Sequence, residues 1–326
     1  MFKLFASIFG LQDKEQGVSI PDSLIKAAIE RALDGTDPRM RILPDYAKVL
    51  RKPVIHAVEH VIVMVDALPP AMPATRESRD ANPVLQAIFT SATRMNEILG
   101  SDSGFRDYLA DATHSPDAVT GMLVAERNEK LCFGYALVDD KLMNDVQHTA
   151  VSFDNHRMVD LAAGEEETRR LVKRRAFDYL LSIALGHVSE QRDEREKLSQ
   201  QRALLKVKLD ILQKGGSGFS SDMGTQDRAA LQARLEEVEG DLHALGPVHE
   251  VLQNNLAIVA ETLGNAEKHL WLEQNDLRLD QHYVLHSDND IAVPAIAFHD
   301  VHDSNGRRVT LLLLSMPLPI ANSSTQ

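Results

Sequence analysis

The stretch from 165 to 214 constrains the fold most, because it contains no proline and only one glycine, Gly186. Apolar residues recur along it by fours and threes, which is the repeat of helices that pack as coiled coils. This first arm carries Phe177, Leu181, Ala184, Val188, Leu198, Leu205, Leu209 and Leu212. A second arm has the same spacing at Leu231, Leu235, Val238, Leu242, Leu245, His249, Leu252, Leu256, Val259, Leu263, Ala266 and Leu270.

A glycine-rich and polar tip loop, 215–227, separates the two arms. Each arm of about fifty residues would be about 75 Å long as a helix, and so short a loop returns the chain antiparallel. Residues 164–214 hold twelve Lys and Arg against nine Asp and Glu, or +3, whereas 227–276 hold three against ten, or −7. Because opposite charges favour pairing of unlike arms, the pattern predicts a long antiparallel coiled-coil hairpin over 164–276.

The second arm contains one strong interruption, Gly246-Pro247. Proline removes a helical hydrogen bond and clashes with the preceding turn, so we expect a kink or break there. The alternative to a projecting hairpin is a pair of separate helices folded back into a helical bundle.

Strand patterns flank this helical segment on both sides. Gly121–Ala125 and Leu131–Leu137 surround the polar run Arg127-Asn128-Glu129-Lys130, which predicts a hairpin with its turn at that run. Near the C-terminus, Ile291–His302 and Arg308–Met316 surround Asn305-Gly306, the strongest short hairpin signal. Leu311–Leu314 lacks alternation, which is typical of a strand covered on both faces. The simplest arrangement is one small sheet built from both segments.

The N-terminal third is helical in pattern. We expect helices over Ile20–Leu33, from about Val54 to Leu68, and over Val84–Leu99 with Pro83 in its first turn. The predicted fold class is therefore α+β and predominantly helical. Its parts are an N-terminal helical region (1–112), a small discontinuous β-sheet platform (113–163 and 277–320), the inserted hairpin (164–276) and a tail (321–326).

The cysteine content and the apolar segments bear on the cellular compartment. The single cysteine, Cys132, cannot form an intramolecular disulfide, which favours a reducing compartment such as the cytoplasm. We expect no membrane-spanning helix and no signal peptide. As a helix, the first eleven residues would gather Phe2, Phe5 and Phe9 on one face, which could lie at a membrane surface or dock on protein.

One five-residue string has the form of a catalytic motif, His56-Ala57-Val58-Glu59-His60. It resembles the H-x-x-E-H signature of the inverted zinc peptidases, the pitrilysin and insulysin group. The resemblance implies His56 and His60 as zinc ligands and Glu59 as the general base, with Glu126 or Glu129 as the only loosely spaced third ligands. It covers five residues only, and the large α/β half-domains of that family have no counterpart here. The alternative is a solvated polar helix face opposite the valines of the same segment.

A second histidine group could bind a metal near the C-terminus: His282, His286, His299 and His302. Because side chains alternate along a strand, His299 and His302 should point to opposite faces. Ordinary polar positions in loops and edge strands are the alternative.

The run from Glu165 to Arg175 places three acids before five basic residues. Acids at a helix start complement its dipole, and Glu-to-Arg pairs four residues apart support the first turns. This interpretation, with the net charge of −13, disfavours nucleic-acid binding. Phosphate-loop, dinucleotide and paired-cysteine zinc motifs do not occur, so we expect no cofactor.

These patterns favour a non-enzymatic interaction, scaffold or adaptor protein that binds a protein partner or a second copy, with a membrane surface as a further partner of residues 2–11. The predicted partner-binding residues are Phe2, Phe5, Phe9, Leu198, Leu205, Leu212, Leu235 and Leu242. The alternative function is a metal-dependent hydrolase that uses the H-x-x-E-H helix or the C-terminal histidines.

Overall fold

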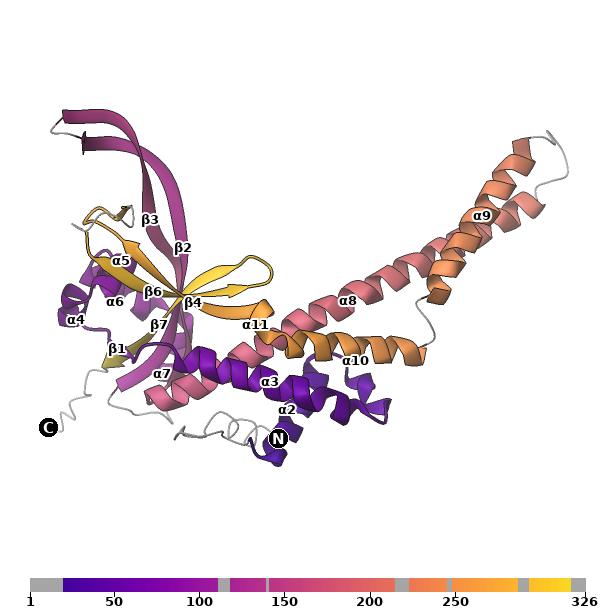
Figure 1. Cartoon of the computed structure of the whole chain (residues 1–326), viewed down its shortest axis with the longest axis horizontal. Helices are drawn as coiled ribbons and strands as arrows, with labels where there is room; N and C mark the ends of the chain where they lie inside the picture. The colour runs from indigo at the N-terminus through magenta and orange to yellow at the C-terminus, as the bar shows by residue number, and fades with distance from the viewer. Residues whose placement is uncertain are drawn as a thin grey trace. The chain divides into compact units, whose positions relative to one another are not determined.

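A computed structural model of the chain describes residues 20–110, 118–138, 141–214, 223–244, 248–286 and 293–317 (Figure 1). The described residues divide into two compact units. Two of the boundaries, Ala57/Val58 and Phe177/Asp178, fall within long helices, and another lies between Asn265 and Ala266. Unit 1 contains Val58–Phe177 and the chain from Ala266 onward, and unit 2 contains Ser19–Ala57 and Asp178–Asn265. No helix among the described residues is long and apolar enough to cross a membrane.

Unit 1 is built on an antiparallel sheet that nearly closes into a barrel. The strands follow the order β4-β6-β7-β2-β3-β5. Their bounds are β2 Ala118–Val138, β3 Lys141–Ala162, β4 Leu270–Arg278, β5 Val284–Leu285, β6 Ala295–Asp303 and β7 Arg308–Pro317. A single bridge between Leu279 and Leu285 joins the two ends of this order, and the short strand β1 (Met72–Pro73) adds to β7 in parallel.

This sheet corrects the predicted fold class at one point, because the platform is not small. β2 and β3 are 21 and 22 residues long, and the prediction of a turn at Arg127-Asn128-Glu129-Lys130 is wrong. Those four residues continue β2 and pair with β3. Charged residues usually signal a turn, but here Arg127 is buried and forms an ion pair with Asp300, which keeps it in the strand.

The C-terminal hairpin prediction is confirmed. β6 and β7 pair antiparallel around Asn305-Gly306, and Gly306 has a φ of 80°, a value that only glycine adopts without strain. β7 pairs in turn with β2, so strand segments from both sides of the helical segment share one sheet. Leu312 and Leu313, which point to opposite faces of β7, are both buried, as the unbroken apolar run indicated.

The inner face of the sheet carries an apolar core that short helices complete. Phe153 and Phe298 stack there at a centroid distance of 5.1 Å, beside Leu123 and Leu312. Residues of α5 (Pro83–Ile88), α6 (Ala92–Ser101) and α7 (Ser103–Ala110) pack against this core. The preceding helix, α4 (Arg76–Ala81), begins at Thr75, whose side chain caps it.

Within unit 1, the start of α8 (Glu165–Lys214) is fixed to the sheet and to the end of α3 (Tyr46–Asp66). Thr168 donates its hydroxyl to the carbonyl of Thr120 in β2, at 2.9 Å. Arg169 donates to the carbonyls of Val65, Leu68 and Pro69 at 2.7–2.9 Å. The predicted Glu-to-Arg pairs of the first turns are present, Glu165 with Arg169 and Glu166 with Arg170.

Unit 2 contains α2 (Asp22–Gly35), the 3₁₀ helix Pro38–Ile42, the first part of α3 and the C-terminal part of α8, together with α9 (Met223–Ala244) and α10 (Val248–Gly264). Arg31 of α2 forms a two-point ion pair with Asp178 of α8, at 2.7 and 2.5 Å. Leu181 approaches Gly35 so closely that a side chain at 35 would contact it at 3.0 Å. A further contact within unit 2 joins α10 to the residue before the 3₁₀ helix: Asn255 donates to buried Asp37 at 3.2 Å.

The predicted coiled-coil hairpin is wrong. The return arm is not one rod, because it is divided into α9, α10 and the four-residue α11 (Ala266–His269), and its last residues, from Leu270, form strand β4. Pro247 lies between α9 and α10, where a proline ends a helix, although 245–247 themselves lie outside the described residues. Asn255 of α10 contacts Asp37, which caps the 3₁₀ helix, and α10 also contacts α8, where His187 Nδ1 lies 3.4 Å from the Thr262 hydroxyl. The heptad pattern could not reveal this, because it records which face is apolar and not which element covers it.

Candidate interaction surface

The residues of the H-x-x-E-H string lie on α3. His56 and Glu59 are exposed, and His60 is half-buried with its Nε2 2.7 Å from the carbonyl oxygen of Leu270. The described residues contain no group of three or more His, Cys, Asp or Glu side chains that could hold a metal ion. The resemblance to zinc peptidases therefore gains no third ligand from the described part of the chain.

The C-terminal histidines are also separated. His282 and His286 flank β5, and His286 Nε2 lies 3.3 Å from Asp280. His299 and His302 point to opposite faces of the continuous strand β6. The ring of His302 stacks on Trp271, and its Nε2 lies 3.2 Å from Glu273. Burial lowers the pKa of His299, against the opposing effects of Asp300 and Asp276.

The predicted partner-binding leucines are half-buried rather than exposed. This holds for Leu198 and Leu205 on α8 and for Leu235 and Leu242 on α9, where Lys206 and Glu239 form an ion pair at 2.7 Å. Phe2, Phe5 and Phe9 lie outside the described residues, as does the side chain of Leu212. None of these four leucines is exposed, although Leu204 and Val207 on α8 are each 56% exposed. The surface with the more exposed pair of neighbouring apolar side chains lies elsewhere.

That surface is the outer half of the β2–β3 pair, which extends beyond the barrel as a curved two-stranded ribbon (Figure 1). β2 pairs with β7 only up to Ala125, and β3 pairs with β5 only at Thr149 and Ala150. In the described structure, β2 from Arg127 onward thus has β3 as its only strand neighbour. We call residues 127–134 and 146–150 the ribbon.

Two large apolar side chains project from the ribbon on one face. Leu131 is 67% exposed and Phe133 is 73% exposed, and alternation along the strand places them side by side. Opposite them on β3 lie Thr149 and Gln147. The other face has little room, because a side chain at Gly134 would meet the His148 ring at 3.2 Å.

A buried polar cluster holds the base of the ribbon. Asp300 of β6 is fully buried, and its carboxylate accepts hydrogen bonds from Thr310 at 2.6 Å and Asn275 at 2.9 Å. Arg127 Nη1 lies 2.7 Å from Asp300 Oδ2, but no N–H of Nη1 is directed at an acceptor, so this contact is an ion pair without a hydrogen bond.

Glu129 extends this cluster toward the ribbon. It lies 3.2 Å from Arg127 and 3.1 Å from Arg308 of β7, so charges on two strands fix the direction in which β2 leaves the barrel. Sequence reasoning missed this role, although the alternation Leu131-x-Phe133 beside a charged run was visible.

Comparison with known proteins adds no relative: no family model, no curated protein and no solved structure matches this chain. The site is therefore interpreted from its geometry alone.

Proposed function

We propose that this chain is a non-enzymatic interaction protein that binds a partner protein through the ribbon. The observation that carries the proposal is the pair Leu131 and Phe133, both more than two-thirds exposed on one face of a strand with a single neighbour. Fully burying one such side chain is worth roughly 1.5–3 kcal/mol, so a partner that covers both gains a substantial part of a specific affinity.

The open edge of the ribbon favours binding by strand addition. A strand with one neighbour presents a row of unpaired N–H and C=O groups, which an extended segment of another protein can satisfy. A two-stranded pair is also only marginally stable in water by itself. The ion pairs of Arg127 and Glu129 hold the base of the ribbon in place before a partner arrives, which lowers the cost of ordering on binding.

The metal-dependent hydrolase has less support, because His60 and Leu270 are in contact and the described residues lack a three-ligand group.

The cytoplasm stays our proposed location, on the evidence of a single cysteine, Cys132. Contact of residues 2–11 with a membrane surface is a separate proposal. Vesicle co-sedimentation of the full chain and of a chain without residues 2–11 tests it, and equal sedimentation would contradict it.

The test of the main proposal places a photoreactive amino acid at position 133 and, as a matched control, at position 63. Val63 lies on α3 and is 69% exposed, so it matches Phe133 in exposure but not in location. We expect irradiation in cells to give a defined adduct from position 133 and none from position 63. The adduct should disappear when Leu131 is replaced by aspartate in the same chain.

The mass of the adduct identifies the partner class. An adduct of twice the chain mass means a second copy, and any other defined mass means a different protein. Equal patterns from positions 133 and 63, or an adduct that survives Leu131→Asp, would contradict the proposal.

A further inference from the structure

A second feature of unit 1 is a cavity of about 500 Å³ beside β3. Its floor is apolar and consists of Ala87 and Ile88 from α5 and Val151 and Phe153 from β3, all of them buried. Small-molecule sites commonly have volumes of roughly 300–1,000 Å³. Most of the other residues that line this cavity are polar or charged, among them Asp102, Ser152 and Asp154, so its lining as a whole is more polar than apolar.

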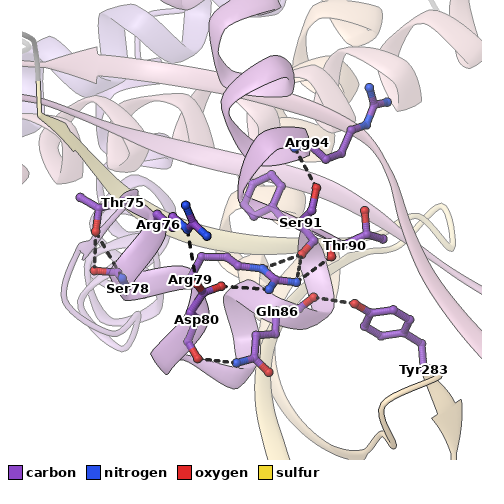
Figure 2. Close-up of polar contacts among 11 residues, drawn as sticks. Thr75, Arg76, Ser78, Arg79, Asp80, Gln86, Thr90, Ser91, Arg94 and Tyr283 are labelled. Atoms are coloured by element: carbon purple, nitrogen blue, oxygen red, sulfur yellow. Dashed lines mark hydrogen bonds and ion pairs between the residues drawn. The ribbon is translucent and has the colours of Figure 1, made fainter.

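The α5–α6 connection, which lines part of the cavity, is held by hydrogen bonds to its backbone carbonyls. Figure 2 shows Arg79 donating to the carbonyl oxygens of Phe89 and Thr90, at 2.8–3.1 Å. The hydroxyl of Tyr283, which also lines the cavity, donates to the carbonyl of Gln86 in α5 at 3.1 Å. The cavity is therefore formed before any ligand enters, which reduces the entropy lost on binding.

The rim of the cavity has an excess of negative charge. Asp102 accepts from the backbone N–H groups of Phe105 and Met158 at 2.9 and 3.0 Å, and Asp154 accepts from Asn128 and Ser152. Arg94 is the one basic side chain that lines the cavity in the described structure.

That basic charge is offset outside the cavity, because Glu97 lies 3.3 Å from Arg94. Burial lowers the pKa of His156, against the opposing effects of its contact with the Ile88 carbonyl and of Asp154, so the ring adds little positive charge at neutral pH. Its half-buried ring stacks on Phe89 at 5.4 Å.

We propose that this cavity binds an organic ammonium compound whose apolar body lies on the floor and whose charged nitrogen lies at the rim with Asp102 and Asp154. A carboxylate that accepts a charge-assisted hydrogen bond from an ammonium group binds it more strongly than it binds a neutral donor. An anion of the same size would meet the two carboxylates against the single positive charge of Arg94.

Three probes of one shape test this proposal on the full chain: 2-phenylethylamine, 2-phenylethanol and 3-phenylpropanoate. Titration calorimetry or protein-observed NMR gives their dissociation constants. We expect the amine to bind at least about tenfold more tightly than the alcohol, and the carboxylate more weakly than both. Asp154→Asn should bring the amine close to the alcohol, whereas Asp45→Asn, at an exposed carboxylate that does not line the cavity, should leave it unchanged.

A filling variant, Ser152→Trp, should abolish binding of the amine and the alcohol together, since Ser152 lines the cavity and is exposed. If its thermal unfolding shows that it does not fold, Thr90→Trp takes its place. Equal affinities for the three probes, binding that survives the filling variant, or no saturable binding at millimolar concentration would each overturn the proposal.

Discussion

At the scale of single residues, the buried charges of the barrel should contribute more to stability than the exposed charges do. Asp300 is fully buried, has three partners and lies where β6, β7 and β2 meet. Removing one member of a buried pair leaves the other as an uncompensated charge, whereas an exposed pair contributes little. Stability should therefore respond much more to this cluster than to the many surface ion pairs.

Asp300→Asn should lower the free energy of unfolding by about 3 kcal/mol, because buried Arg127 would lose its fully buried counter-charge and keep only the partly exposed Glu129. Urea unfolding at neutral pH measures the change. The matched exposed substitution Asp80→Asn should change it by less than about 1 kcal/mol. If both variants unfold at the same urea concentration, the buried ion pair does not stabilise the barrel.

The pH dependence of stability should include a contribution from His156. Burial lowers its pKa below 6.5 in the folded chain, so the unfolded chain binds the proton more readily. The free energy of unfolding should accordingly fall as the pH drops through about 6.5 toward the folded pKa. His156→Gln should flatten the loss between pH 7.5 and 5.5, and identical slopes for the two proteins would exclude this role.

At the scale of elements, the glycines of the turn and of the helix differ in the backbone conformation that they adopt. Gly306 has a positive φ in the β6–β7 turn, while Gly186 lies exposed within α8 with open space around its Cβ position. The same substitution should thus have opposite effects at the two sites.

Gly306→Ala should lower the free energy of unfolding by about 1–2 kcal/mol, because alanine is strained at positive φ. Gly186→Ala should raise it by about 0.5–1 kcal/mol, because alanine loses less backbone entropy in a helix. Thermal unfolding of the two variants gives the signs directly, and a shift in the same direction for both would contradict the assigned backbone geometry.

At the scale of the whole molecule, the closure of the sheet is its most specific feature. The Leu279–Leu285 bridge joins the two ends of the strand order, and neighbouring backbone bonds support it. These are Val151 N–H to the Tyr283 carbonyl at 2.9 Å and His286 N–H to the Arg278 carbonyl at 2.8 Å.

Leu279→Ala should open this seam, because Leu279 is buried in the core cluster and its loss leaves a cavity. We expect a cost of about 2–4 kcal/mol in the free energy of unfolding. Hydrogen exchange should accelerate first at the amides of Val151 and His286. Unchanged protection there, with faster exchange at distant strands instead, would show that the seam does not close the sheet.

Local patterns in the sequence predicted those elements whose cause is local. The Asn305-Gly306 turn, the helix after Ile20 and the charge pairs at the start of α8 depend on residues within a few positions of each other, and the structure confirms them. Two local rules were overridden. Pro53 lies inside α3 rather than before it, and Phe89 ends α5, so the helix expected to reach Leu99 is divided into α5 and α6.

The sequence by itself determined the apolar faces and the chemistry of the Asn305-Gly306 turn, because each depends on neighbouring residues. The count of one cysteine excluded an intramolecular disulfide at Cys132. Only the tertiary structure decided that Arg127 continues a strand, that the return arm divides into separate helices, and that Leu131 and Phe133 face outward. Those outcomes depend on partners far away in the chain, such as Asp300 for Arg127 and Asp37 for Asn255. The type of a residue indicates whether it is expected to be buried or paired with an opposite charge. Which residue it contacts is decided only by the folded chain.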